Sequence, residues 1–416
     1  MQLRTGIALT LVSALVWACG GSVGNGNDAG GGETGTPDMD AGANPDAMDE
    51  PPVTTYPADF PAPPRVILSG GPVLKNFTVI PVFWANDALQ SQVEQFVKDM
   101  TGTPYWAATT KEYGVTDYTV GASIVVTDPP PASTDDTEIQ KWLGAQTDGT
   151  HMGWPSSNDQ TLFALFYPAS TKITLDNVQS CNGFGAYHNS ATSTNGDFAY
   201  AVMPRCQGGL DTLTVSTSHE LVEAATDPFP MVKPAYQRVD NDHIVWMLAG
   251  GGEVADLCEF DRTASQRLVG NFLVQRSWSN ASIKAGHDPC VPALQGAFFA
   301  AAPVLADNVK LTYQGQSFVT KGVKIPLGQS ATIDVQLYSD APKDAWTVSA
   351  QDRTSGFGNA GYVTFQWDST TGKNGDVLHL TITAAKQSPM GGAIIAITSQ
   401  DAAMTRHRWL GAVGFN

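Results

Sequence analysis

The stretch S-T-S-H-E-L-V-E-A-A-T-D-P, residues 216–228, places one histidine and two glutamates on a segment with helical patterning. Each residue of an α-helix turns the chain by about 100°. His219 and Glu223 therefore lie one turn apart on a polar face, Glu220 lies beside them, and apolar side chains occupy the opposite face. The pattern predicts a helix with Asp211 as its N-cap and the Asp-Pro pair at its end.

A His-Glu-x-x-Glu segment on a helix is suited to metal chemistry. Ligands at positions i and i+4 can bind one ion, and the acid after the first ligand stands beside that ion, as in the H-E-x-x-H zinc peptidases. We predict that His219 and Glu223 are metal ligands and that Glu220 is the catalytic base. Two alternatives remain open: a solvated acidic helix face, or a hydrogen-bonded network of acids without a metal.

A third ligand has to come from another segment. The stretch G-G-G-E-V-A-D-L-C-E-F, residues 250–260, combines a glycine turn, acids and a cysteine. Asp256 is the first choice there and Glu253 the second, while His188 and His243 are outside candidates. One imidazole and two carboxylates make a harder site than is usual for zinc, so we predict Zn²⁺ and leave Mn²⁺ or Ca²⁺ open.

Several motifs in residues 69–290 resemble those of one known family. They include S-C-N-G-F-G-A-Y-H-N-S, S-T-S-H-E-L-V-E-A-A-T-D-P-F-P, G-G-E-V-A-D-L-C-E-F and F-L-V-Q-R-S-W-S-N. Their order resembles that of the plant EXORDIUM/phosphate-induced protein family and its bacterial relatives. The resemblance implies a zincin-like fold and an extracellular, cell-wall-associated protein. It also implies five site residues: His219, Glu220, Glu223, Glu253 and Asp256.

The N-terminus has the features of an export signal. Residues 1–19 combine Arg4, an apolar run and a Val-Trp-Ala-Cys end that resembles a bacterial lipobox. We predict a lipoprotein signal peptide that ends at a lipidated Cys19, which would anchor a secreted protein to a membrane of the bacterial cell envelope, at the outer membrane or cell surface. A plain secretory signal with a stray cysteine is the alternative.

Four cysteines remain after Cys19 is set aside. An even number in an exported chain suggests two disulfides, for which the sequence permits three pairings. We prefer the pairing of neighbours, Cys181 with Cys206 and Cys258 with Cys290.

The 416-residue chain has room for two or three domains. Residues 20–60 read as a disordered acidic linker of Gly, Asp and Pro. Residues 61–294 alternate strand patterns (75–85, 161–168, 198–204) with a helical pattern (88–100), which predicts an α+β zincin-like domain with a mixed sheet and an active-site helix. Residues 295–416 contain short alternating runs, which predict a C-terminal immunoglobulin-like β-sandwich.

Three functions compete at this stage. The first is a cell-surface, zinc-dependent metallopeptidase that acts on extracellular protein or peptide, with Trp246 and Trp278 as candidates to line its cleft. The second is a non-catalytic envelope protein for binding or adhesion, with a structural metal and a protein or cell-wall glycan as ligand. The third is the metal-free acid network. The net charge of −17 excludes nucleic acid as a partner.

Overall fold

The computed structural model describes residues 55–259, 261, 263–355 and 360–415. The predicted signal peptide, Cys19 and residues 20–54 of the predicted linker lie outside these ranges. Within the described ranges, no helix combines the length and the apolar character that crossing a bilayer requires. The chain is a mixed α+β structure with more strands than helices, and from residue 299 onward every described element is a strand.

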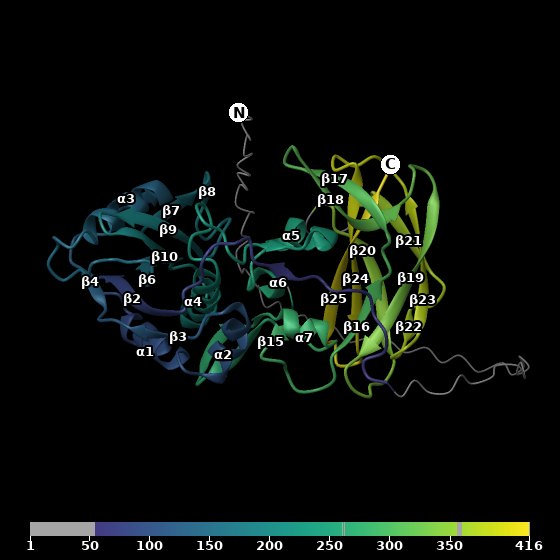
Figure 1. Cartoon of the computed structure of the whole chain (residues 1–416), viewed down its shortest axis with the longest axis horizontal. Coiled ribbons are helices and arrows are strands. Elements are labelled where there is room, and N and C mark those ends of the chain that lie inside the picture. The colour runs from purple at the N-terminus through teal and green to yellow at the C-terminus, as the bar shows by residue number, and fades with distance from the viewer. Residues whose placement is uncertain (1–54, 260, 262, 356–359, 416) are drawn as a thin grey trace, which may run out of the picture.

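A six-stranded mixed sheet forms the centre of the first half of the chain (Figure 1). Its strands follow the order β3-β2-β6-β10-β9, and β4 pairs with the later part of β2. Neighbouring strands are parallel except β9, which runs antiparallel to β10 at one edge. The strands are β2 (Asn76–Trp84), β3 (Asp117–Val120), β4 (Ile124–Val126), β6 (Thr161–Tyr167), β9 (Tyr187–Ser193) and β10 (Gly196–Pro204). The strands predicted at 75–85, 161–168 and 198–204 are β2, β6 and β10.

The central strands consist mostly of apolar residues because the sheet is covered on both faces. All seven residues of β6 are buried. Leu162 and Phe166 enter a core shared with α1, α2 and α4, while Phe163 and Leu165 enter a second core shared with α3. The covering elements are α1 (Gln90–Met100), α2 (Pro104–Thr110), η1 (Lys111–Tyr113), α3 (Asp136–Gln146), β5 (Ser133–Asp135), β7 (Lys172–Leu175) and β8 (Val178–Gln179).

The helix predicted from the His-Glu-x-x-Glu segment is α4 (Gly209–Thr226), and it follows β10 directly. It begins before the predicted N-cap: the cap is Gly208, in the left-handed conformation, and the Asp211 carboxylate pairs with Arg267 instead. The alternative of a solvated acidic helix face is wrong. His219 is 7%, Glu220 4% and Glu223 3% exposed, because the polar stripe faces other segments of the protein.

Short elements connect α4 to the β-rich half. They are β11 (Arg238–Val239), which pairs with β1 (Val66–Ile67), then η2 (Asn241–His243), α5 (Val245–Gly250), α6 (Asp256–Glu259), β12 (Ser265–Val269), β13 (Phe272–Gln275), β14 (Ser277–Trp278), α7 (Asn280–Lys284) and β15 (Cys290–Val291).

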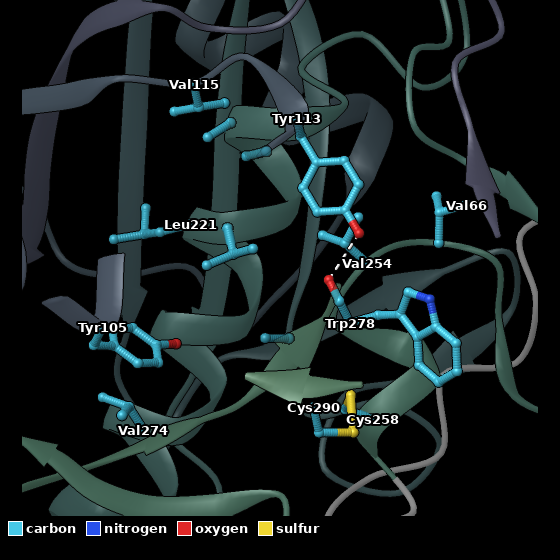
Figure 2. Packing of buried hydrophobic residues seen from close by; sticks show 14 of the residues in the cluster. Val66, Tyr105, Tyr113, Val115, Leu221, Val254, Cys258, Val274, Trp278 and Cys290 are labelled. Atoms are coloured by element: carbon cyan, nitrogen blue, oxygen red, sulfur yellow. Dashed lines mark hydrogen bonds between the residues drawn. A yellow bond between two sulfur atoms is a disulfide. The ribbon is translucent and has the colours of Figure 1, made fainter. Parts of the chain in front are cut away.

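Both disulfides join neighbouring cysteines in the chain, which confirms the preferred pairing. Cys181 bonds Cys206 and Cys258 bonds Cys290. The second bridge ties α6 to β15 in the buried region of Figure 2, where the Tyr113 hydroxyl donates to the carbonyl of Trp278 over 2.7 Å. Constraining the loop between Cys258 and Cys290, 32 residues apart, stabilises the fold by about 4 kcal/mol through the unfolded state.

Two sheets form the C-terminal half. One has the order β16-β19-β23-β21 and the other β17-β18-β25-β24-β20-β22. Strand β23 alternates buried and exposed residues, and its Leu378, Leu380 and Ile382 share a single core cluster with side chains of β24 in the other sheet. The strands are β16 (Phe299–Pro303), β17 (Asp307–Tyr313), β18 (Gln316–Lys324), β19 (Ser330–Ser339), β20 (Trp346–Asp352), β21 (Val363–Trp367), β22 (Thr371–Gly372), β23 (Val377–Ala384), β24 (Gly392–Gln400) and β25 (Arg406–Gly414).

The two halves of the chain share a buried contact, with α5, α6 and α7 between the sheets (Figure 1). Trp246 of α5 packs edge-on against Trp278 and against Trp409 of β25, with ring centroids 5.4 and 6.1 Å apart. Trp246 and Trp278 are 6% and 2% exposed, so they are core residues and do not line a cleft.

The last residues of the predicted linker also pack on this region. Of residues 20–60, only 55–60 are described, and they are ordered against the C-terminal half. The Phe60 ring stacks on Tyr338 with centroids 4.3 Å apart, and the backbone N–H of Ala58 donates to Asn374.

Candidate metal centre

The structure brings together all three predicted metal ligands. One ligand atom each from His219, Glu223 and Asp256 lies within 4.8 Å of the others. Nε2 of His219 is 3.0 Å from Oε2 of Glu223 and 3.7 Å from Oδ1 of Asp256. Ligand atoms around a tetrahedral Zn²⁺ lie about 3.4 Å apart, because each is about 2.1 Å from the metal. The observed spacings bracket this value, so the three residues fit the metal.

The His219 ring is oriented by Gln275, at the end of β13. The Gln275 side-chain amide donates from Nε2 to the carbonyl of Ala255, so its Oε1 is the atom that faces Nδ1 of His219, 3.1 Å away. With a metal bound, Nδ1 would carry the proton and Nε2 would present its lone pair to the ion beside Glu223 and Asp256. Without an ion, a protonated Nε2 donates to Oε2 of Glu223. A ring held by a hydrogen bond at one nitrogen and free at the other is the usual arrangement of a metal-binding histidine.

Glu223 divides its two oxygens between structure and site. Its Oε1 accepts from the backbone N–H groups of Ala255 and Asp256, at 3.1 and 3.0 Å. These bonds hold residues 250–259, the 250s segment, against α4. Its Oε2 is left to face the imidazoles of His219 and His188, at 3.0 and 3.9 Å. Glu223 thus fixes the position of Asp256 and offers an oxygen of its own to the site.

Gly251 makes room for the Asp256 carboxylate. Its φ of 113° lies in the left-handed region that favours glycine, and a Cβ atom there would lie 2.1 Å from Oδ2 of Asp256. The glycine turn preceding this acid is therefore a requirement of the site geometry.

The fold brings some of the other predicted candidates to the cluster and places His243 away from it. His188, the second residue of β9, faces the cluster: its Nδ1 is 3.4 Å from Oε2 of Glu220, and its Nε2 is 3.7 Å from Oε1 of Glu253. His243 lies elsewhere and pairs with Asp240 at 2.8 Å. Glu220 is not in the His219 triad; one of its oxygens lies within 4.8 Å of ligand atoms of His188 and Glu223.

Sequence reasoning missed three members of the cluster. The sequence pattern indicates Asp227 only as part of a helix stop, yet one of its carboxylate oxygens lies with ligand atoms of His188 and Glu253 in a second group. Glu259, at the end of α6, adds another buried acid. Gln275 lies in the V-Q-x-x-W motif of the family resemblance, so that motif held a signal for it.

The cluster concentrates negative charge in a buried place. In the ion pairs that the structure describes around it, the cationic partners are His188 and His219. Burial, followed by the charges of Glu223 and Asp227, raises the pKa of Glu253 well above its usual range. Burial and Glu223 do the same to the pKa of Asp256. Burial raises the pKa of Glu259 to about 7.

Burial acts on the pKa of a histidine in the opposite direction, because it disfavours the charged imidazolium. Burial alone would lower the pKa of His219, but the charge of Glu223 and then that of Glu220 hold it well above 6.5. The pKa of Glu223 is lowered because His219 outweighs the effect of burial. Without a cation, the cluster therefore retains protons that a divalent ion would replace.

Access to the cluster is limited. The side chains of His188, Glu220, Glu223 and His219 are between 3 and 8% exposed, whereas those of Glu253 and Asp256 are 14 and 13% exposed. The 250s segment is thus the side nearest to solvent.

Comparison with known proteins adds no relative. The sequence matches no protein-family model, and it has no match among curated proteins. The resemblance to the EXORDIUM family rests on the quoted motifs alone.

Proposed function

We propose that the protein is a zinc-dependent hydrolase of peptide bonds, built on a zincin-like domain. The observation that carries the proposal is the convergence of His219, Glu223 and Asp256, with Glu220 next to the first ligand on the same helix. The mixed sheet and the helix that carries the ligands pack together, because β9, the antiparallel edge strand, contacts α4. Mn²⁺ and Ca²⁺ are the alternative ions for this donor set.

Each residue has a role that follows from its position. His219, Glu223 and Asp256 would hold the ion, and Gln275 keeps the lone pair of His219 directed toward it. Zn²⁺ bound there supplies a Lewis acid that polarises a carbonyl group and acidifies water. Glu220 is the carboxylate placed to take a proton from the attacking water and to return it to the leaving amine. His188, 3.4 Å from Glu220, holds that carboxylate in place.

The decisive experiment compares metal content with turnover. The purified chain, loaded with Zn²⁺, is incubated with a peptide library with and without a chelator. We expect cleavage that the chelator abolishes. Glu220→Gln should keep the metal and lose at least about 100-fold in rate, which is the usual contribution of a general base. Glu94→Gln on α1 is the matched control and should leave both the metal content and the cleavage rate unchanged. Persistent cleavage by Glu220→Gln would reject the assigned roles.

A second function has one observation in its favour. The small exposed fractions of His219, Glu220 and Glu223 suit a structural ion in an envelope protein that binds a protein or a cell-wall glycan. In that case chelation would lower the melting temperature sharply, and no peptide would be cleaved by the metal-loaded chain. The C-terminal half, which we propose to be an immunoglobulin-like sandwich, would then serve adhesion or spacing.

The proposed location is the outer face of a bacterial cell envelope, with a lipid on Cys19 as the anchor. This proposal is supported by the lipobox-like sequence and by the two disulfides, which persist in oxidising compartments.

A further inference from the structure

A second group of ligand atoms lies beside the first. One atom each from His188, Asp227 and Glu253 lies within 4.8 Å of the others, and none of these residues belongs to the His219 triad. They come from β9, from the residue after α4 and from the 250s segment. Nε2 of His188 is 3.7 Å from Oε1 of Glu253 and 3.2 Å from the backbone carbonyl oxygen of Asp227.

Two oxygens of this group are buried without a hydrogen-bond partner. They are Oδ2 of Asp227 and Oε1 of Glu253. Asp227 is 0% exposed, and its other oxygen accepts from the backbone N–H of Ala235 over 2.5 Å. A buried polar atom without a hydrogen-bond partner has lost its hydration without compensation, and the cost is larger when the atom is charged. The two carboxyl groups are close enough to share a proton, and burial together with this sharing raises the pKa of Glu253. A divalent cation between them would replace that proton and give both oxygens a partner.

We propose that His188, Asp227 and Glu253 hold a second divalent cation. One imidazole nitrogen, two carboxylates and a neighbouring backbone carbonyl form an oxygen-rich donor set, which suits Mn²⁺, Zn²⁺ or Ca²⁺. The group formed by His188, Glu220 and Glu223 is a weaker candidate, because the Glu223 oxygens are already engaged by the 250s backbone and by His219. The inference goes beyond the proposed hydrolase function, since it concerns other ligands and another ion.

The second cation would act on the proposed base through His188. A neutral imidazole with Nε2 bound to a metal carries its proton on Nδ1. Nδ1 faces Oε2 of Glu220 at 3.4 Å, so it would donate to that carboxylate. His188 is then a positioning residue whose tautomer is set by the second ion.

The test is a count of bound cations on the full-length chain. The protein and its variants are incubated with excess Mn²⁺, and in parallel with Zn²⁺, and are then desalted. Elemental mass spectrometry then gives the number of metal ions bound per chain. We expect two ions per native chain. Asp227→Asn and Glu253→Gln should each retain one, His219→Ala should retain one, and Asp227→Asn combined with His219→Ala should retain none. Asp211→Asn, near the start of α4, is the control and should retain two.

Asn at 227 keeps an oxygen that can accept from Ala235, so the fold should persist, and circular dichroism checks this. If Asp227→Asn does not fold, Glu253→Gln decides the question. One ion per native chain, lost in His219→Ala and kept in Asp227→Asn, would overturn the second site and leave the first. One ion with the opposite pattern would support the second site and overturn the first. No bound ion would overturn both.

Discussion

Gln275 acts on the candidate centre at the scale of one side chain. It joins Ala255 to His219 through the two ends of its amide, and it thereby determines which nitrogen of the histidine is free. Its own position is held by the backbone, because its N–H donates to Oγ of Ser218 and its carbonyl accepts from the hydroxyl of Tyr105. A substitution at 275 therefore changes the amide and leaves these backbone bonds in place.

We expect Gln275→Ala to weaken Zn²⁺ binding by about 10- to 100-fold, the range typical of residues that orient a metal ligand. The reason is that Nδ1 of His219 loses its acceptor, so the ring is no longer held in one tautomer. Competition with a chromogenic chelator measures the affinity. Gln266→Ala, in β12 of the same hairpin, is the control. Equal affinities of Gln275→Ala and the native chain would contradict the orienting role.

At the scale of elements, the site depends on how the 250s segment is held against α4. Glu223 binds two backbone N–H groups of this segment, and the Cys258–Cys290 disulfide ties α6 to β15. Gly251 then allows the Asp256 side chain to lie close to the backbone. Asp256, the first residue of α6, is therefore positioned by α4, by the Cys258–Cys290 disulfide and by Gly251 together.

Gly251→Ala tests directly how the Asp256 side chain is positioned. A residue that has a Cβ atom at a positive φ lowers the free energy of unfolding of the protein by about 1–2 kcal/mol. Gly270→Ala in the β12–β13 turn has the same kind of cost, with a φ of 53° and no atom near its Cβ. We expect both variants to lose stability in urea unfolding, and Gly251→Ala to lose more, because its Cβ would also collide with the side chain of Asp256. Only Gly251→Ala should also lose Zn²⁺ affinity, by at least about 10-fold, because its Cβ displaces the carboxylate of Asp256. A similar affinity loss in both variants would argue against this account.

At the scale of the whole molecule, the β-rich half is part of the same buried structure as the sheet that supports the site. Trp409 of β25 lies between Trp246 and Tyr338, and the carbonyl of Asp242 accepts from the hydroxyl of Thr320 over 2.9 Å. Contacts of this kind couple the unfolding of the two halves.

We expect Trp409→Ala to lower the unfolding free energy by about 3–5 kcal/mol, because it empties a large buried volume between the halves. Trp367→Ala, in β21 at a sheet edge and only partly buried, removes the same side chain and should cost less. Urea unfolding followed by circular dichroism compares the two. A smaller loss for Trp409→Ala than for Trp367→Ala would contradict a structural interface at α5 and β25.

Much of the local structure could be predicted from the sequence. The strands at 75–85, 161–168 and 198–204 are apolar runs, and the helix predicted between Asp211 and Asp227 has helical spacing, so these elements depend on neighbours in the chain. The i, i+4 spacing of His219 and Glu223 follows from helical geometry alone. The disulfide pairing also matched the preference for the nearest cysteines.

The sequence by itself determined the helix and the side chains on its polar face, because these depend on local spacing. The glycines, acids and cysteine of residues 250–260 indicated that segment as the source of a further acid. Only the tertiary structure decided that this face is buried, that His188 and Asp227 join it, and that Gln275 orients His219. These residues lie on separate segments, and the order of strands in the sheet and the path of the connections bring them together. Periodicity does not encode that path, because it depends on which surfaces pack when the whole chain folds.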